Sequence, residues 1–247
     1  MEFLKLFIGT FVLRWYVLLF LLAYLVIAPR DIGWRRMILF MILGFGIAFA
    51  AEASSIRNGF PFGWYFYLPE ATVDRELWIA GVPFMDSLSF VFLNYAAFAL
   101  AGILRPRAGV FGRALGSAAL VMLLDVVIDP VALRGSRWFL GQIFYYPYGG
   151  GYFGVPLANF GGWFLVGFVT ALLYQLIERR LFSPVLRLAT HDSRFAILAP
   201  CALYFGILAF NITMTFWIGE IRMGLTSTGI AFIPMLLLAT KRIRNNQ

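Results

Sequence analysis

The sequence predicts an all-α integral membrane protein with seven transmembrane helices, and two observations carry this prediction. Hydrophobic residues make up 62% of the 247 residues and charged residues 13%, whereas ordinary soluble domains are about 45–50% apolar and about 25% charged. Apolar stretches also fill nearly the whole chain. We therefore expect one polytopic membrane domain over residues 1–247, surrounded by the lipid bilayer.

The predicted helices follow from the length of the apolar stretches, because a helix needs about 20 apolar residues to cross about 30 Å of hydrocarbon. Seven stretches approach this length: Phe7–Ala28, Met37–Glu52, Pro83–Leu104, Arg113–Asp129, Ala158–Ile177, Phe195–Trp217 and Ile221–Thr240. The second and fourth are short, so their polar ends are expected to lie within the headgroup layer. No soluble domain follows the first stretch, which we interpret as a span rather than a cleavable signal peptide.

The basic residues are concentrated between alternate spans. Four segments hold 13 of the 20 lysines and arginines but 3 of the 12 acidic residues: Pro29–Arg36, Leu104–Arg113, Glu178–Arg194 and Lys241–Gln247. Seven spans place all four on the same side of the membrane. Because cytoplasmic loops are rich in Lys and Arg, we expect the N-terminus outside and the C-terminus in the cytoplasm. The net charge of +8 is then explained by the orientation of the protein in the membrane, and no nucleic-acid partner is expected.

The two long outer loops, Ala53–Val82 and Pro130–Leu157, are dense in Gly, Pro, Tyr and Trp. Gly and Pro at this density indicate irregular backbone, which survives at membrane depth only when protein or a watery cavity covers it. An aromatic belt at the membrane interface accounts for part of the rings. It does not account for the clustered glycines, so we expect the two loops to form a folded cap.

Acidic residues gather in the outer part of the predicted membrane domain. Glu52 ends the second span, Asp86 opens the third, Asp125 and Asp129 end the fourth, and Asn159 opens the fifth. Each ionised acid costs about 2.5–3.5 kcal/mol at a helix centre on insertion scales. Four carboxyl groups in one layer therefore predict a polar pocket that faces inward.

Asp125 and Asp129 are four residues apart and share one face of a helix. Two neighbouring carboxylates in a low dielectric do not both ionise comfortably, so at least one is expected to keep its proton and to serve as a general acid. The structural alternative is that Asp129 and Pro130 cap and end the helix, with Asp125 paired to Arg134 or Arg137.

Structural alternatives also exist for the other polar residues. Glu52 and Asp86 have Arg57 and Arg75 as candidate ion-pair partners, and Asn159 has the alternative role of a helix N-cap. We therefore keep both interpretations open for these three residues.

Further polar residues are interpreted as structural or solvated. Glu220 and Arg222 are expected to pair in a tight turn, and Arg14 and His191 are expected to be structural or solvated. His191 and Cys201 are the sole residues of their types, which excludes a disulfide within the chain and the usual His- or Cys-rich metal sites. We expect no metal.

Several strings resemble the bacterial and archaeal membrane carotenoid biosynthesis proteins, a family that includes carotenoid 1,2-hydratases of γ-carotene-type and bisanhydrobacterioruberin-type substrates. The resemblance covers roughly residues 45–170, about half of the chain. It is carried by Glu52, Gly59–Tyr65, Gly81–Phe84, Asp125, Asp129-Pro130, Trp138 and Tyr152–Trp163. The most specific string is Tyr-Phe-Gly-Val-Pro-Leu-Ala-Asn-Phe at the start of the last of these ranges.

The resemblance implies a lyase-type enzyme that adds water across the terminal C1–C2 double bond of an acyclic carotenoid ψ-end. Such a reaction needs a proton at C2, a tertiary carbocation at C1 and one water molecule. We favour Asp129 as the proton donor, with Asp125 or Glu52 sharing the proton. Asn159 and Asp86 are expected to hold and deprotonate the water.

Aromatic side chains are expected to bind this substrate: Trp64, Tyr65, Trp138, Tyr152, Phe153 and Trp163. Tyr65 and the three tryptophans present faces that stabilise a cation by about 0.5–2 kcal/mol each. The implied chemistry needs no metal, nucleotide or redox cofactor. The implied location is the cytoplasmic membrane of a prokaryote, with other carotenoid biosynthesis enzymes as candidate partners.

Four alternatives compete with hydration. A carotenoid cyclase or isomerase uses the same acid and the same cation. A non-catalytic carotenoid-binding or transport protein binds the same substrate unchanged, although no inverted repeat is evident. A prenyltransferase of the UbiA type has the Asp125-x-x-x-Asp129 spacing but generally wants a second Asp-rich cluster. A retinal photoreceptor needs a lysine inside a span, and neither Lys5 nor Lys241 is suitably placed.

Overall fold

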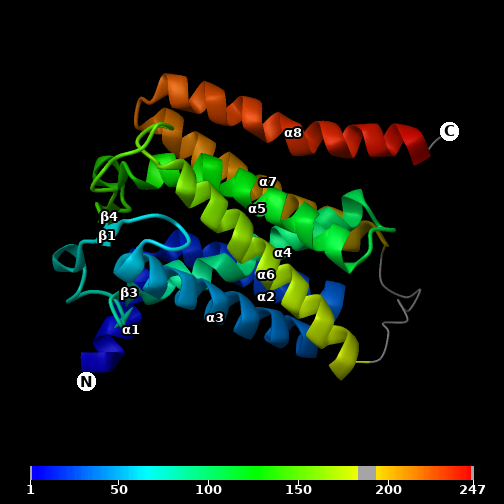
Figure 1. Cartoon of the computed structure of the whole chain (residues 1–247), viewed down its shortest axis with the longest axis horizontal. Helices are drawn as coiled ribbons and strands as arrows, with labels where there is room; N and C mark the ends of the chain where they lie inside the picture. The colour runs from blue at the N-terminus through cyan, green and yellow to red at the C-terminus, as the bar shows by residue number, and fades with distance from the viewer. Residues whose placement is uncertain (1, 183–192, 246–247) are drawn as a thin grey trace.

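The computed structural model describes residues 2–182 and 193–245, and within these ranges seven helices are long and apolar enough to cross a membrane (Figure 1). The predicted number of spans and the all-α class are therefore confirmed. The helices are α2 (Trp15–Ile32), α3 (Trp34–Asn58), α4 (Phe84–Leu104), α5 (Val110–Ala132), α6 (Leu157–Leu181), α7 (Ser193–Trp217) and α8 (Ile221–Asn245). Most of the expected basic loop Glu178–Arg194, with His191, lies outside the described residues.

The first predicted span, Phe7–Ala28, is divided between two helices. Helix α1 (Glu2–Leu13) ends before Arg14, and α2 begins directly after it. Arg14 is buried and donates hydrogen bonds from Nε and Nη2 to the carboxylate of Glu76, at 3.0 and 2.9 Å. Because a buried guanidinium has to be paired, the lipid-facing span starts after this residue and not within α1.

The second and fourth spans are longer than predicted, and the expectation that they are short is wrong. Helix α3 has 25 residues and α5 has 23, which is enough to cross the hydrocarbon layer. As a consequence Glu52 lies inside α3 and not at its end, and Asp125 and Asp129 lie inside α5. Sequence analysis ended the two spans at Glu52 and Asp129, although both residues are buried in the helix bundle.

Pro130 does not end α5, contrary to the structural alternative for Asp129. The helix continues through this proline to Ala132, and the amide of Leu133 still donates to the carbonyl of Asp129 at 2.8 Å. A proline in a helix removes one backbone hydrogen bond. Here the loss falls in the last turn, next to the helix end, where few such bonds remain.

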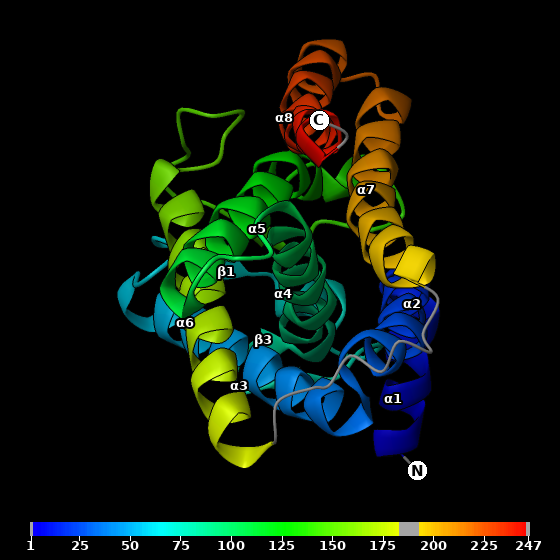
Figure 2. The same ribbon diagram turned by 90° about the vertical axis from the view of Figure 1, so that its right-hand side faces the viewer.

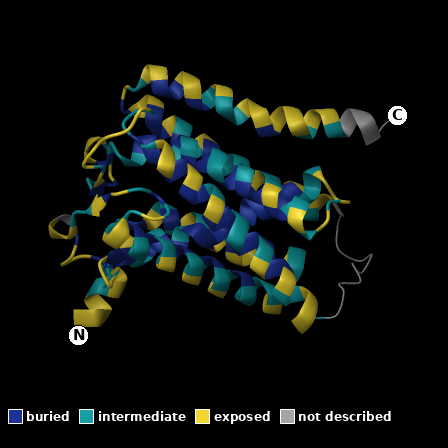
Figure 3. Cartoon of the chain, viewed as in Figure 1, coloured by how far each residue is buried: buried dark blue, intermediate teal, exposed yellow. Residues whose placement is uncertain are grey.

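Helix α4 occupies the centre of the bundle. Figure 2 shows α2, α3, α5, α6 and α7 arranged around it, and 78% of its span is buried. A helix that is apolar on all sides is expected at such a central position. Around it, buried residues face the interior and exposed residues face outward along the length of the helices (Figure 3). The outward residues are mostly large and apolar, as a lipid-facing surface requires.

The two ends of the bundle differ in chemistry. One end carries the turns between α2 and α3 and between α4 and α5, and the end of α6, where the described basic segments lie; we call it the basic end. The other end carries the two long aromatic connections, residues 59–83 and 133–156, which we call the cap. The basic segments thus share one end, as the sequence predicts.

The cap is folded, and its two segments pair with each other. Strand β1 (Phe66–Tyr67) runs antiparallel to β4 (Phe144–Tyr145), with Tyr67 opposite Phe144. Within the first segment β2 (Trp78–Ile79) pairs with β3 (Val82–Pro83), and short 3-10 turns lie at η1 (Pro69–Ala71) and η2 (Gly135–Arg137). Gly162 in α6 permits close docking of the cap, since a methyl group there would lie 2.8 Å from the carbonyl oxygen of Pro61.

Arg14 joins both segments of the cap to the start of α2. Besides Glu76 in the first segment, its Nη1 donates to the carbonyl of Leu140 in the second segment at 3.0 Å. Burial lowers the pKa of Arg14, but the hydrogen bond with Glu76 and the nearby negative charges together raise it above its usual range, so the guanidinium stays charged. The structural interpretation of Arg14 is therefore supported by its contacts.

A second ionic contact fixes the other side of the cap. Glu220, in the turn between α7 and α8, accepts hydrogen bonds from Arg134 at 3.1 Å and from Arg137. The expected pairing of Glu220 with Arg222 is wrong, because the two cap arginines reach the carboxylate across the bundle end. Arg134 also donates to the carbonyl of Phe153 at 3.0 Å, which ties together distant parts of the second segment.

We predict that Glu76→Gln destabilises the folded protein by about 3–5 kcal/mol, because it leaves the buried Arg14 without a counter-charge. Thermal and denaturant unfolding in detergent micelles measures the change. The double variant Arg14→Met, Glu76→Leu should recover most of the loss, because it removes both charges. Asp74→Asn is the matched control on an exposed side chain and should have little effect. A Glu76→Gln protein as stable as the wild type would contradict the prediction.

Candidate active site

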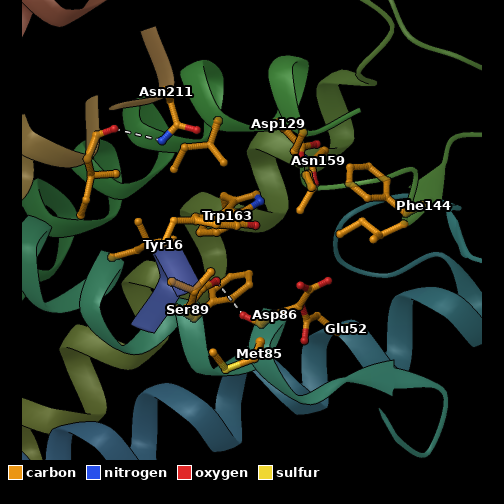
Figure 4. A pocket seen from close by; sticks show the side chains of 18 of the residues that line it. Tyr16, Glu52, Met85, Asp86, Ser89, Asp129, Phe144, Asn159, Trp163 and Asn211 are labelled. Carbon is orange, nitrogen blue, oxygen red and sulfur yellow. Dashed lines mark hydrogen bonds between the residues drawn. The ribbon is translucent and has the colours of Figure 1, made fainter. Parts of the chain in front are cut away.

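A cavity of about 160 Å³ lies beneath the cap, between the helices. Both segments of the cap line the cavity, together with the helices α2, α3, α4, α5 and α7 and the first turns of α6. Figure 4 shows the cavity with its lining side chains. Among the residues predicted to form the site, Glu52, Asp86, Asp129 and Asn159 all line it. The predicted inward-facing polar pocket is therefore present.

Asn159 joins the two aspartates of α5. Its Nδ2 donates to Oδ2 of Asp125 at 2.7 Å and to Oδ2 of Asp129 at 2.9 Å. The hydroxyl of Tyr146, in the cap, donates to the same oxygen of Asp129 at 2.5 Å. We call these four residues the Asp129 cluster. Asp125 is fully buried behind the other three and does not line the cavity.

Glu52 forms a second group of polar side chains with α4 and the cap. Ser87 donates to Oε2 of Glu52, and the hydroxyl of Tyr67 donates to Oε1 at 3.3 Å. Asp86 lies next to these residues and interacts with Glu52 electrostatically. We call these four residues the Glu52 cluster. Glu52 is 4% exposed, so its hydrogen bonds come from the protein interior.

The cap tyrosines of both clusters remain protonated. Burial, and then the charge of Asp129, raise the pKa of Tyr146 well above its usual range. Burial and the charge of Glu52 do the same to the pKa values of Tyr65 and Tyr67. A phenol that keeps its proton is a permanent donor, so Tyr146 and Tyr67 each supply a hydrogen bond to a carboxyl group.

The two clusters face each other across the cavity. In Figure 4, Asp129 and Asn159 lie on one side, Glu52 and Asp86 lie on the other, and Trp163 lies between them. Asp86 and Asp129 are close enough for their charges to interact. The indole of Trp163 stacks on the ring of Phe90, with 3.9 Å between centroids and 9° between planes, so an aromatic face separates two acidic walls.

The predicted aromatic residues divide into two groups. Tyr65, Trp138 and Trp163 line the cavity, and Trp138 is held by a hydrogen bond from Nε1 to the carbonyl of Val131 at 3.0 Å. The other three lie outside the lining: Trp64, Tyr152 and Phe153. These three rings pack against other aromatic side chains and not against the cavity.

Contacts of the three outer rings illustrate this packing. Trp64 is 42% exposed and stacks on Phe66, while Tyr152 packs edge-on against Phe153 and Phe160. From the sequence these rings cannot be distinguished from those that turn inward, because the cap strings are aromatic almost throughout.

The ion pairs that were proposed with Arg57, Arg134 and Arg137 as structural alternatives for the acids are replaced by other contacts of these arginines. Arg134 and Arg137 bind Glu220 and not Asp125, and Arg57 donates to the carbonyls of Ala53 and Ala80. The carboxyl groups of Glu52 and Asp129 accept hydrogen bonds from neutral donors, and both line the cavity.

Asn159 is not an N-cap. Helix α6 begins at Leu157 with Pro156 as its N-cap residue, and the amide of Asn159 bonds to the carbonyl of Pro156 at 3.0 Å. The side chain is therefore free to join the two aspartates of α5.

Sequence analysis missed Tyr67, Ser87 and Tyr146 as partners of the carboxyl groups, and Tyr16 as part of the cavity wall. Tyr67 and Tyr146 belong to the aromatic strings of the cap, but their contacts with the clusters depend on the folded cap, in which Tyr67 lies in β1 and Tyr146 directly follows β4. Ser87 directly follows Asp86, and no sequence signal separates it from an ordinary helical serine. Within the described ranges, no three His, Cys, Asp or Glu side chains gather as a metal site.

Comparisons with known proteins place the chain in a family. The profile of a family described as carotenoid biosynthesis protein matches residues 10–234. The chain belongs to the carotenoid biosynthesis protein family. The resemblance found in the sequence is therefore confirmed, and it extends beyond the part of the chain that carried it. No solved structure matches the chain.

A curated protein is also similar to the chain. Over 170 residues the chain is 31% identical to the bisanhydrobacterioruberin hydratase of Haloarcula japonica. The alignment covers 68% of this chain and 52% of that protein, so the chain spans about half the length of the relative it matches.

We predict that Asn159→Leu destabilises the protein by about 1–3 kcal/mol, because it leaves carboxyl oxygens of Asp125 and Asp129 without their shared donor. Asn211→Leu is the matched control. Asn211 is also buried and also lines the cavity, but its Nδ2 reaches only the carbonyl of Ile207 in its own helix at 2.9 Å. Unfolding in detergent should separate the two variants, and equal losses would refute the bridging role of Asn159.

Proposed function

We propose that the chain is a carotenoid hydratase that adds water across the terminal C1–C2 double bond of an acyclic ψ-end. The observation that carries this proposal is the cavity in which two acidic walls face each other across aromatic rings. Membership of the carotenoid biosynthesis family supports a carotenoid as the substrate. The hydratase named among its relatives supports the addition of water.

Asp129 is the proposed proton donor. Both of its hydrogen-bond donors, Asn159 and Tyr146, reach Oδ2, so neither occupies Oδ1. A proton on Oδ1 has the freedom to transfer to C2 of the substrate. Asp125 shares the amide of Asn159 but lies behind it, and its proposed role is to hold that amide in place.

Aromatic faces are proposed to stabilise the tertiary cation at C1. Trp163 and Trp138 line the cavity together with Tyr65, and each face is worth about 0.5–2 kcal/mol to a nearby cation. The pair of Trp163 and Phe90 is fixed by stacking. A rigid face of this kind needs no rearrangement as the charge develops.

Asp86 and Asn159 are proposed to bind the water. Both amide hydrogens of Asn159 serve the aspartates, which leaves its carbonyl oxygen as an acceptor. The water oxygen bonds to C1, and its proton passes to the carboxylate of Asp86. Asp129 has then lost one proton and Asp86 has gained one. Transfer of this proton across the cavity restores both groups, so the net reaction consumes one alkene and one water.

The size of the cavity limits how much of the substrate it holds. A cavity of about 150 Å³ accommodates one benzene molecule, and this cavity is of similar size at about 160 Å³. It therefore accepts one end of a carotenoid and leaves the remainder outside. This matches a reaction confined to the terminal double bond.

The proposal is tested by expressing the chain in cells that accumulate lycopene, γ-carotene or an acyclic fifty-carbon carotenoid. Chromatography with mass detection should reveal a product heavier by one water, and labelled water should supply its oxygen. Asp129→Asn should lower turnover at least 100-fold, since a positioned general acid contributes about 10²–10⁴-fold. Glu70→Gln, on an exposed cap side chain, is the control and should have normal turnover.

Three results would count against this assignment. An isomeric product would indicate cyclisation or isomerisation through the same cation. Normal turnover in both Asp129→Asn and Asp125→Asn, in folded protein, would remove the acid from the Asp129 cluster. Unchanged carotenoid in every strain, with intact protein in the membrane, would favour a binding or transport protein.

We also propose that the cap lies on the outer side of the cytoplasmic membrane and the basic end in the cytoplasm, since basic loops stay cytoplasmic. In a Cys201→Ser background, Tyr148→Cys in the cap and Arg107→Cys at the basic end place one exposed thiol at each end. A membrane-impermeant maleimide should label only the first in intact cells and both in lysed cells. Labelling of only the second in intact cells would reverse the orientation.

A further inference from the structure

A second hollow lies on the lipid-facing surface of the bundle, between α2 and α7. It has a volume of about 530 Å³, and all nine of its lining residues are apolar. Three of these residues are alanines: Ala23 on α2 and Ala199 and Ala202 on α7. Small side chains at these positions leave the space between the two helices open, whereas most lipid-facing positions carry large side chains. We call this hollow the α2–α7 groove.

The groove and the cavity are parts of one seam. Phe20 of α2 lines both. Towards the cap, the same two helices contribute Tyr16 and Asn211 to the wall of the cavity. Towards the basic end, they line the groove as far as Ile27 and Phe195. Because α2 and α7 lie side by side (Figure 2), the groove follows the same two helices that form this wall of the cavity.

The seam is long enough to hold most of a forty-carbon polyene. Residues from Asn211 to Phe195 on α7 extend for about 24 Å at 1.5 Å per residue, and a forty-carbon carotenoid is about as long as the hydrocarbon layer, roughly 30 Å. The side chains along the seam change from polar in the cavity to apolar in the groove, which matches a substrate that reacts at one end and is hydrocarbon along the rest of its length. Carboxyl groups surround the end that reacts, and apolar side chains line the path of the hydrocarbon.

We propose that the α2–α7 groove binds the polyene chain of the substrate while its terminal double bond lies in the cavity, and that the substrate enters sideways from the bilayer. This inference rests on the proposed function. A conjugated chain is rigid, so it loses little conformational entropy when it binds in the groove. A flexible lipid acyl chain loses more, which favours the polyene as the occupant. Phe20 lies where the groove meets the cavity and contacts the bound chain at this junction.

The test fills the groove without changing the cavity. Ala202→Phe narrows the groove from α7, and Ala23→Phe narrows it from α2. Ala239→Phe is the matched control, because Ala239 is exposed on α8, away from the groove. Purified proteins are incubated with an acyclic forty-carbon carotenoid and with a ten-carbon acyclic alkene that carries the same end group. The short substrate reaches the cavity but not the groove.

Both groove variants should lose at least tenfold in kcat/KM for the long substrate, because loss of contact with a few methylene-sized groups already exceeds a tenfold effect. Turnover of the short substrate should stay within about twofold of the wild type, and Ala239→Phe should match the wild type on both. Equal loss on both substrates, or none on either, would overturn the groove as the polyene site.

A binding measurement separates this inference from the proposed function. Protein purified from carotenoid-accumulating cells should retain pigment, measured by its absorption per mole of protein, and Ala202→Phe should retain at least tenfold less. If pigment is retained in the groove but never hydrated, the proposed function fails and the groove stands. Wild-type protein without pigment, equal pigment in both proteins, or a phospholipid that Ala202→Phe loses in its place would refute the polyene as occupant.

Discussion

The structure depends on supplying buried carboxyl groups at membrane depth with hydrogen-bond donors from the protein itself. Asp129 and Glu52 belong to different helices and lie on opposite walls of one cavity. Each receives a phenolic hydroxyl from the cap, from Tyr146 and Tyr67 respectively. Because the strands β1 and β4 pair with each other, these two hydroxyls are delivered together. Folding of the cap therefore supplies part of the hydrogen bonding that the two buried acids require.

The helices and the carboxyl layer were predictable because they follow from rules that act along the chain. Apolar length marks a span, and the spacing of Asp125 and Asp129 places them on one helix face. The errors came where tertiary contacts decide. The first predicted span is divided at Arg14, whose partner Glu76 is 62 residues away in the sequence. Helix α5 continues past Pro130, and its last turn is packed in the bundle. No local pattern reports such contacts.

The same distinction applies within the candidate site. Carboxyl groups at membrane depth can be recognised from the sequence as candidate site residues, because burying them in lipid is energetically costly. Aromatic residues of the cap cannot be recognised in this way, because an aromatic ring fits the membrane interface, the protein core and the wall of a binding site equally well. Trp163 and Trp64 look alike in the sequence, yet one stacks on Phe90 beside the acids and the other lies 42% exposed on the cap.

The buried pair of Arg14 and Glu76 has a consequence for biogenesis. The arginine is synthesised long before its partner in the cap, and Leu140, its other acceptor, follows much later still. During synthesis the N-terminal segment therefore carries an uncompensated guanidinium, which stays with water or lipid headgroups until the cap residues Glu76 and Leu140 are available. The beginning of the chain consequently reaches its native contacts only after both segments of the cap have been synthesised.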